Sequence, residues 1–212
     1  MSDDKAITEL PPPLLESALA EFRQHGFADA NVGRIASAAG MSKKTIYRHV
    51  PSKEALLEAV MHAMVTRSVG PVTTAAPGLS PAEWLKTFMK AFAALTFSEH
   101  GIASYRVVMS EAQRFPHVSQ LYVQTVKRLA IRPLADQLAA YGRDGRIDIK
   151  QAERAAMMLV SMIVADGLRD AVLGLAEPPR GAELDALVNE GVDIFLQGIA
   201  RDRPLGDLPS RG

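Results

Sequence analysis

The chain has 212 residues, of which 48% are hydrophobic and 23% charged, a balance typical of globular proteins and unlike that of disordered chains. Lysine and arginine equal aspartate and glutamate at 24 each, so any surface that binds a polyanion must be local. The absence of cysteine excludes disulfides, thiolate metal sites and cysteine nucleophiles. No apolar run reaches the roughly 20 residues of a membrane span, and the acidic N-terminus is unlike a signal peptide, so we expect a cytoplasmic protein.

Apolar residues recur at helical spacing along almost the whole chain, and the alternation typical of strands is nearly absent, which predicts an all-α fold. Prolines, glycines and N-capping side chains divide this pattern into about nine helices. We expect them at about residues 14–25, 32–39, 43–49, 52–67, 82–97, 102–114, 117–141, 150–176 and 181–200. Pro133 lies inside the seventh segment, where it should kink the helix or split it in two.

The clearest break in the pattern is the sequence GPVTTAAPGLSP at residues 70–81, with three prolines and two glycines. It follows a small N-terminal module of three short helices (1–51) and a connecting helix (52–69). A larger helical body (80–200) comes after it. The last residues, 201–212, have the composition of a flexible tail.

Residues 30–53 contain five basic side chains and no acidic one, although the chain as a whole has no net charge. The basic residues are Arg34, Lys43, Lys44, Arg48 and Lys53. Such a cluster is typical of a surface that binds nucleic acid, while a bare charge run also suits an ordinary solvent-exposed helix face. The underlying pattern favours DNA, because a short helix, a turn at residues 39–42 and a second short helix form a helix-turn-helix.

In a helix-turn-helix the second helix enters the major groove, and Ile35, Ile46 and Val50 supply an apolar seam that would hold it. Lysine can bond guanine edges or phosphates, and hydroxyl and imidazole groups suit phosphate oxygens. The start of the following helix also favours a phosphate. The residues expected at DNA are therefore Asn31, Ser42, Lys43, Lys44, Thr45, Tyr47, Arg48, His49 and Lys53. A packing role for Tyr47 and a plain surface role for His49 are the alternatives.

The segment LLESALAEFRQHGFADANVGRIASAAGMSKKTIYRHVPSKEALLEAV resembles the N-terminal DNA-binding domain of TetR-family transcriptional regulators. The matching features are Gly26-Phe27, Ile35-Ala36, Ala39 to Ser42, Thr45 to Tyr47, His49 and Ser52 to Leu56. Val50 departs from the pattern, since the family usually has phenylalanine there. Ala30 stands where a family hydroxyl often contacts phosphate.

A second stretch, Ser104 to Val126, resembles the AefR-like TetR subgroup through the sequence EAQRFP at 111–116. The resemblance implies a body that binds a small-molecule effector. It also implies a homodimer formed by the last two helices. The faces of these helices are apolar, and the chain has no other helix to cover them. A two-fold dimer would present two reading helices to a palindromic operator in double-stranded DNA.

The effector is expected to be apolar or aromatic, because large, flexible or aromatic side chains lie on stripes that we interpret as inward-facing. The candidate ligand-binding residues are Trp84, Phe88, Phe92, Tyr105, Met109, Tyr122, Val126, Met158, Met162 and Asp166. Any one of them can instead simply fill the core. Asp166 needs a partner among its apolar neighbours, which can be Arg169 across a dimer contact, a nearby hydroxyl or a polar group of the ligand.

The function expected from these patterns is that of a DNA-binding regulator, a repressor released from its operator by a small molecule. The alternatives are a helical small-molecule-binding protein or an enzyme with no role at DNA. The sequence disfavours an enzyme, since it has no His-x-x-x-His pair, no nucleophile elbow and no phosphate-binding glycine loop. A simple carrier would leave the basic segment unexplained. No metal or cofactor is expected.

Overall fold

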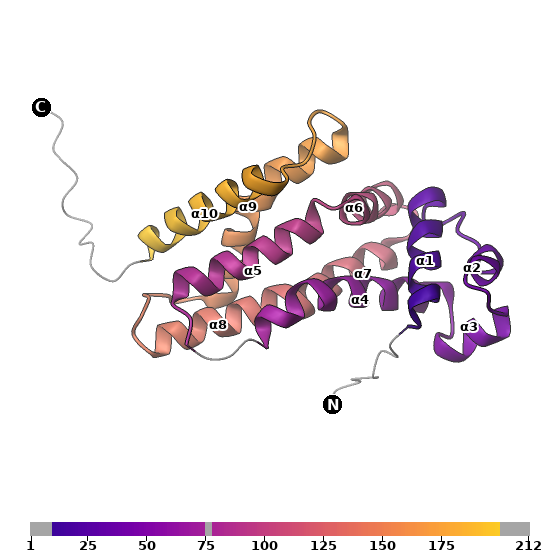
Figure 1. Cartoon of the computed structure of the whole chain (residues 1–212), viewed down its shortest axis with the longest axis horizontal. Coiled ribbons are helices and arrows are strands. Elements are labelled where there is room, and N and C mark those ends of the chain that lie inside the picture. Colours follow the sequence, from indigo (N-terminus) through magenta and orange to yellow (C-terminus); the bar gives the residue numbers. More distant parts are fainter. Residues whose placement is uncertain (1–9, 75–77, 200–212) are drawn as a thin grey trace, which may run out of the picture.

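The computed structural model describes residues 10–74 and 78–199, and within these ranges the chain is almost entirely helical (Figure 1). The elements are α1 (Pro12–His25), α2 (Val32–Ala38), α3 (Lys43–His49), α4 (Lys53–Thr73), α5 (Pro81–Thr96), α6 (Glu99–Glu111), α7 (Pro116–Val126), the π-helical turn η1 (Lys127–Ile131), α8 (Arg132–Arg143), α9 (Ala152–Leu173) and α10 (Gly181–Gly198). The all-α prediction is confirmed. The expected tail at 201–212 lies outside the described residues.

Several predicted boundaries shift. Helix α4 continues to Thr73, so the break expected from Gly70 onward begins later. Pro71 is tolerated because it lies in the last turn, where a missing N–H removes a single hydrogen bond. Helix α6 begins at Glu99 and not at Ile102, because the Ser98 side chain caps it by accepting a hydrogen bond from the Gly101 N–H.

Pro133 does not split the seventh predicted segment, because a π-helical turn lies just before it. Helices α7 and α8 are joined without a break by η1, whose five residues widen the helix just before the proline. A wider turn relieves the position where the proline ring and its missing N–H disrupt regular α-helical bonding. Counting α7, η1 and α8 as one, the described ranges form nine helices.

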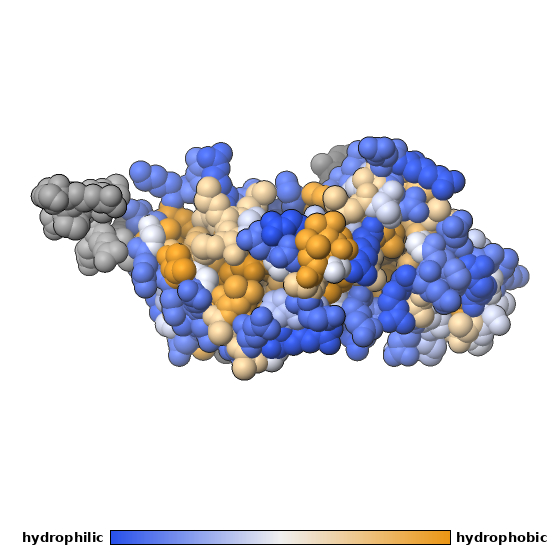
Figure 2. All heavy atoms as spheres, turned by 90° about the horizontal axis from the view of Figure 1, so that it is seen from above, coloured by the Kyte–Doolittle hydropathy of each residue, from blue (hydrophilic) through white to orange (hydrophobic). Residues whose placement is uncertain are grey.

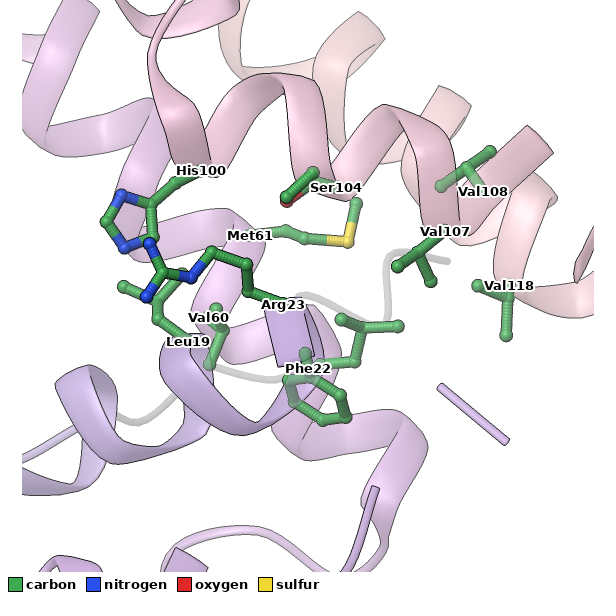
Figure 3. A pocket seen from close by; sticks show the side chains of 12 residues that line it. Leu19, Phe22, Arg23, Val60, Met61, His100, Ser104, Val107, Val108 and Val118 are labelled. Carbon is green, nitrogen blue, oxygen red and sulfur yellow. The ribbon is translucent and has the colours of Figure 1, made fainter. Parts of the chain in front are cut away.

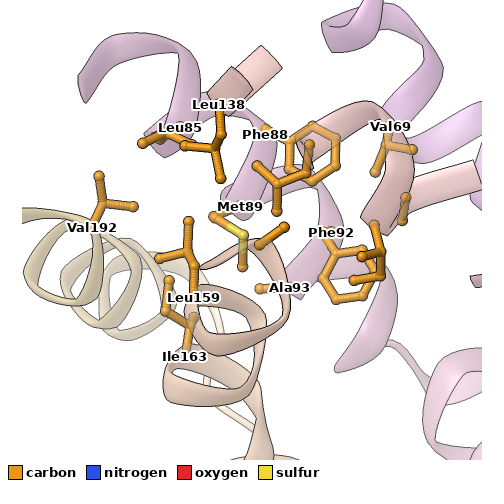
Figure 4. Close-up of a cluster of buried hydrophobic side chains, with 14 of the residues drawn as sticks. Val69, Leu85, Phe88, Met89, Phe92, Ala93, Leu138, Leu159, Ile163 and Val192 are labelled. Atoms are coloured by element: carbon orange, nitrogen blue, oxygen red, sulfur yellow. The ribbon is translucent and has the colours of Figure 1, made fainter. Parts of the chain in front are cut away.

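Two hydrophobic cores lie along the molecule, and α4 contributes to both. Helices α1–α3, here called the head, pack against the first half of α4, with Leu56, Val60 and Met61 in that core. The second half of α4, from Val65, joins the core of the body formed by α5–α10. Figure 4 shows the centre of the body core, where Phe88 and Met89 of α5 are fully buried. A movement of α4 therefore affects both parts of the molecule.

Helix α10 lies along α5 and α9, and ion pairs fix it to α5. The Lys86 Nζ is 2.7 Å from Asp193 Oδ1, and the Lys90 Nζ is 3.0 Å from Asp185 Oδ1. The outer faces of α9 and α10 carry exposed apolar side chains, and Figure 2 shows apolar groups on the α10 side of the molecule. No helix within the described ranges combines the length and apolarity needed to cross a bilayer.

Candidate nucleic-acid interface and internal cavity

Helix α2 is fixed to α1 by a buried carboxylate. Glu21 is only 8% exposed, and it accepts hydrogen bonds from the Asn31 N–H at 2.8 Å and from Arg34 Nε at 2.9 Å. Burial would raise the pKa of the Glu21 carboxyl, but the hydrogen bonds from Arg34 and Asn31 outweigh burial and hold this pKa below its usual value. The Asn31 side chain in turn caps α2 by accepting from the Gly33 N–H at 2.7 Å, as predicted.

The turn between α2 and α3 has the conformation that its sequence predicts. Gly40 has φ of 65°, a left-handed value that favours glycine. The Ser42 hydroxyl caps α3 by accepting from the Thr45 N–H at 3.0 Å. Ile35, Ile46 and Val50 are all buried beneath the turn, so the predicted seam is present.

The face of α3 opposite the seam is exposed and positively charged. Lys43, Lys44 and Arg48 are exposed on it, and the Tyr47 side chain is 48% exposed. Residues 43 and 47, and 44 and 48, are four apart, so these four side chains share one helix face. Tyr47 therefore does not have the packing role that was the alternative to DNA binding. The geometry suits a helix that reads the major groove.

Other predicted DNA-binding residues form contacts within the head. The Thr45 hydroxyl lies 2.9 Å from that of Ser42, and His49 is half-buried. Lys53 is turned inward, since its Nζ donates to the Ala28 carbonyl at 2.9 Å and lies 4.8 Å from the centre of the Phe27 ring. The Lys53 amine, which was expected to meet a phosphate at the start of α4, is therefore bound to backbone carbonyls of the head.

The positive charge of residues 30–53 is thus concentrated on α3. Arg34 is paired with Glu21, which lies outside the basic segment, and Lys53 is bound to backbone carbonyls. The exposed cations that remain are Lys43, Lys44 and Arg48.

Gly33 is a residue that sequence reasoning missed. The Lys43 side chain crosses α2 at this position, and a Cβ placed on Gly33 would lie 2.6 Å from Lys43 Cε and 2.9 Å from Asn31 Oδ1. A side chain at position 33 would therefore require the flexible end of Lys43 to move. The sequence signal was the glycine in the first turn of a short helix, where it weakens the helix and needs a reason.

The head meets the body at a joint between α1, α4, α6 and α7 (Figure 3). The Arg23 side chain of α1 reaches Glu99 of α6, with Nη1 3.0 Å from Oε2. Beneath this ion pair is a small, largely apolar hollow of about 20 Å³, here called the joint hollow. Its lining includes Phe22 of α1, Met61 of α4 and Ser104 of α6.

A second cavity, of about 50 Å³ and partly open to solvent, lies between the helices of the body and α4 and is here called the inner cavity. It is lined by Met61, Met64, Val65, Phe92, Leu95, Thr96, Gly101, Ser104, Tyr122, Thr125, Val126 and Leu168. Of the predicted ligand-binding residues, Phe92, Tyr122 and Val126 line it. Tyr105 packs edge-on against Tyr122, with ring centres 6.0 Å apart.

The remaining predicted ligand-binding residues lie elsewhere. Trp84 and Phe88 are buried and stack on each other in the body core, with ring centres 5.1 Å apart. The inward orientation predicted for Met109, Met158 and Met162 is wrong, because their side chains are 58%, 62% and 46% exposed. For Met158 and Met162 the reason is that apolar residues occur on nearly all sides of α9, so spacing does not distinguish its inner from its outer face.

Asp166 also faces outward, so the prediction that it lies among apolar neighbours is wrong. Its side chain is 88% exposed, and its Oδ1 lies 2.8 Å from Nη1 of Arg169 on the same helix. The partner is therefore the arginine one turn along α9.

Sequence reasoning missed most of the inner cavity. Met61 and Met64 come from α4, which was interpreted only as a connection, and Thr96, Ser104 and Thr125 provide hydroxyl groups. The spacing of the two methionines by one helical turn on an apolar stripe was the available signal. Burial raises the pKa of the Tyr122 phenol to about 12, so this group stays protonated at neutral pH.

Comparisons with known proteins agree with this architecture. The family model of bacterial regulatory proteins of the tetR family matches residues 14–60, and that of the AefR-like transcriptional repressor C-terminal domain matches residues 83–198. The HTH-type transcriptional regulator BetI of Agrobacterium fabrum is 27% identical over 188 residues, which are 88% of this chain and 87% of BetI. RutR of Escherichia coli K12 is 29% identical over 130 residues, 61% of this chain and 53% of RutR.

Solved structures show the same fold. A TetR-family regulator from Mesorhizobium loti superposes with a TM-score of 0.75 at 22% identity, covering 89% of this chain and 95% of that one. The flavonoid-responsive regulator FrrA superposes with a TM-score of 0.69 at 26% identity, covering 90% of this chain and 97% of FrrA.

Proposed function

The chain belongs to the TetR family of DNA-binding transcriptional regulators, and from this premise we propose that it is a repressor that binds a palindromic operator as a homodimer and leaves it when a small molecule enters the inner cavity.

The observation that carries the proposal is the exposed basic face of α3, held by a buried seam. Lys43 and Lys44 stand at the start of the helix, where they would meet base edges or phosphates. Tyr47 and Arg48 follow one turn later and would contact the DNA backbone. The ion pair of Arg34 with Glu21 supports the same role, because it keeps α2 in place under the reading helix.

The outer faces of α9 and α10 support a dimer. Met158, Met162, Leu173 and Ile194 are large apolar side chains that are 46% to 63% exposed in the single chain. Pairing these faces in two copies would form a four-helix bundle and remove the apolar surface from water. Two-fold symmetry would place two α3 helices on one side of the duplex, roughly 34–36 Å or somewhat more apart.

A structural connection between the inner cavity and the head supports release by an effector. Met61 and Ser104 line both the inner cavity and the joint hollow, so they form a common wall between the two. A molecule that displaces Met61 would press on the contact of α1 with α4 and α6. A coupling of about 1–3 kcal/mol between the two sites would change operator affinity by about 5- to 150-fold.

The proposal is tested by selecting duplexes from random DNA with the purified chain and measuring their affinity by fluorescence anisotropy. We expect Lys44→Ala to weaken binding by about 1–3 kcal/mol, the value of a contact with a base edge. Tyr47→Ala should weaken it by about 1 kcal/mol, the value of one hydrogen bond to the DNA backbone. Lys150→Ala is the matched control, since Lys150 is exposed in the body far from α3 along the chain. A protein that binds no duplex at low salt would contradict the proposal.

A further inference from the structure

We propose that the inner cavity selects an uncharged, single-ring molecule that carries one hydrogen-bonding group, as a simple phenol does. This inference rests on the proposed effector role of the cavity and adds the chemical class of its ligand.

The lining of the inner cavity argues for a neutral ligand. None of the twelve described residues that line it carries a charge, and the polar side chains among them are the hydroxyls of Thr96, Ser104, Tyr122 and Thr125. A buried ionic group without an opposite charge or several hydrogen bonds is strongly disfavoured. A carboxylate or an ammonium ion would therefore lose its hydration in the cavity with no counter-ion to replace it.

The hydroxyl groups argue for one polar atom on the ligand. The Thr96 hydroxyl already donates to the Phe92 carbonyl at 2.9 Å. Thr125 is 1% exposed, one of two buried polar residues among those described, the other being Glu21. Tyr122 keeps its proton at neutral pH and is a hydrogen-bond donor in apolar surroundings. A ligand with a single oxygen can pair with these groups while the rest of its surface contacts side-chain carbon and sulfur.

The size and walls of the inner cavity argue for one ring. A single water molecule needs a cavity of about 10–15 Å³, so a cavity of about 50 Å³ has room for several waters. Flexible thioethers at Met61 and Met64 can shift to admit a flat group, and Phe92 offers an aromatic surface. Larger fused rings would require the surrounding helices to separate.

Charged residues adjoin the lining in the sequence, since Lys127 follows Val126 and Arg169 follows Leu168, but neither is among the lining residues. Thr125 also lines an open groove, together with Glu58, Lys127 and Arg128. In that groove the Arg128 Nη2 lies 3.8 Å from the Glu58 carboxylate, so part of its charge is already compensated. An anionic ligand would have to reach past Thr125 to use this arginine.

Three probes that share a methyl-substituted benzene ring test the inference by calorimetry on the full chain: p-cresol, toluene and p-toluate. The uncharged p-toluamide matches p-toluate in size and separates the effect of charge from that of size. We expect p-cresol to bind about 2- to 10-fold more tightly than toluene, as one additional hydrogen bond allows. We expect p-toluate to bind at least about 100-fold more weakly than p-cresol, as an unpaired buried charge requires. Tyr122→Phe should remove the preference for p-cresol over toluene while the affinity for toluene remains.

Matched variants separate a lost hydrogen bond from a lost fold. Tyr141→Phe makes the same chemical change at a buried residue of α8 that does not line the inner cavity, and it should leave all three affinities unchanged. Thr125→Val is a second change inside the cavity and should reduce p-cresol binding more than toluene binding. Melting temperatures establish that each variant is folded.

The outcomes distinguish this inference from the proposed function. Three results would overturn the ligand class. One is that p-toluate binds as tightly as p-cresol or more tightly, and another is that no probe binds. The third is that Tyr122→Phe and Thr125→Val both keep the preference for p-cresol over toluene. If p-toluate releases the operator and Arg128→Gln prevents this release, the result supports the proposed regulator function and contradicts the proposed class of ligand. If p-cresol binds as expected but operator affinity does not change, the result supports the proposed class of ligand and contradicts release of the operator by this ligand.

Discussion

Glu21 and Arg34 connect the first two helices through a carboxylate that is almost fully buried, with the Arg34 Nε 2.9 Å from Glu21 Oε1. The same carboxylate accepts the backbone N–H of Asn31, the residue that caps α2. One acidic side chain of α1 thus determines where α2 begins and neutralises a cation of the basic segment. Its removal should affect DNA binding without any direct contact to DNA.

Glu21→Gln should destabilise the chain by about 1–2 kcal/mol near neutral pH, because a charged hydrogen-bond acceptor is lost while Arg34 stays half-exposed to solvent. The pKa of Glu21 is lowered in the folded chain, so its contribution is complete above the unfolded value near 4.5 and is lost as the pH falls through the folded pKa. Urea unfolding of both proteins at several pH values checks this. The stability difference should shrink below about pH 4.5, and a constant difference down to pH 2 would contradict it.

Gly33→Ala should weaken operator binding while the melting temperature stays close to that of the parent. An added Cβ would meet Lys43 Cε at 2.6 Å, so the lysine stem must leave its path across α2. A loss of about 1 kcal/mol, or about fivefold in affinity, is expected from one displaced contact. The decisive measurement is a double-mutant cycle: once Lys43→Ala is present, Gly33→Ala should have little further effect. Additive losses would show that Gly33 acts by another route.

Lys53→Met should lower stability and leave the salt dependence of DNA binding nearly unchanged. The substitution keeps an apolar stem but removes the hydrogen bonds to the carbonyls of Ala28 and Ala30. Each phosphate contact contributes about 0.9 to the slope of log affinity against log salt. Anisotropy titrations at several salt concentrations check the prediction, with Lys44→Ala as the comparison that should reduce the slope. An equally large reduction of this slope in Lys53→Met would show that Lys53 contacts a phosphate.

Met61→Leu should preserve binding of the effector but reduce the release of the operator that it causes. Leucine has similar volume and costs less than about 1.5 kcal/mol in a core, but it lacks the flexible thioether that the inner cavity shares with the joint hollow. The measurement is operator affinity with and without saturating ligand. Met89→Leu is the control, because Met89 is buried in the body core and lines neither of these hollows. Equal loss of response in both variants would argue against a specific role for Met61.

Gly191→Ala should destabilise the contact of α10 with α9 by about 1–3 kcal/mol, because a Cβ there would lie 2.6 Å from Cγ1 of Ile163. Ile163→Ala removes Cγ1, so Gly191→Ala should cost clearly less stability in the Ile163→Ala background than in the parent. Thermal unfolding followed by circular dichroism gives both values. An equal cost of Gly191→Ala in both backgrounds would show that the two residues do not compete for this space.

Much of the head could be predicted from the sequence, because its determinants are local. Asn31, Ser42 and Ser52 cap the helices that follow them, as their side chains and positions predict. On the seven-residue helix α3, the apolar Ile46 marks the buried side, and its neighbour Tyr47 lies on the exposed side. Such interactions lie within one or two turns of a helix, so the order of residues is sufficient to predict them.

The tertiary structure decided which of these groups are free to act. Arg34 is neutralised by a carboxylate thirteen residues away, and Lys53 turns to carbonyls twenty-five and twenty-three residues before it. Helix α9 has apolar residues around most of its circumference, so its periodicity does not show that Met158 and Met162 face outward. The inner cavity combines side chains from α4 to α7 and α9. Contacts between distant segments depend on how helices pack, and hydrophobic spacing identifies a buried stripe without identifying its partner.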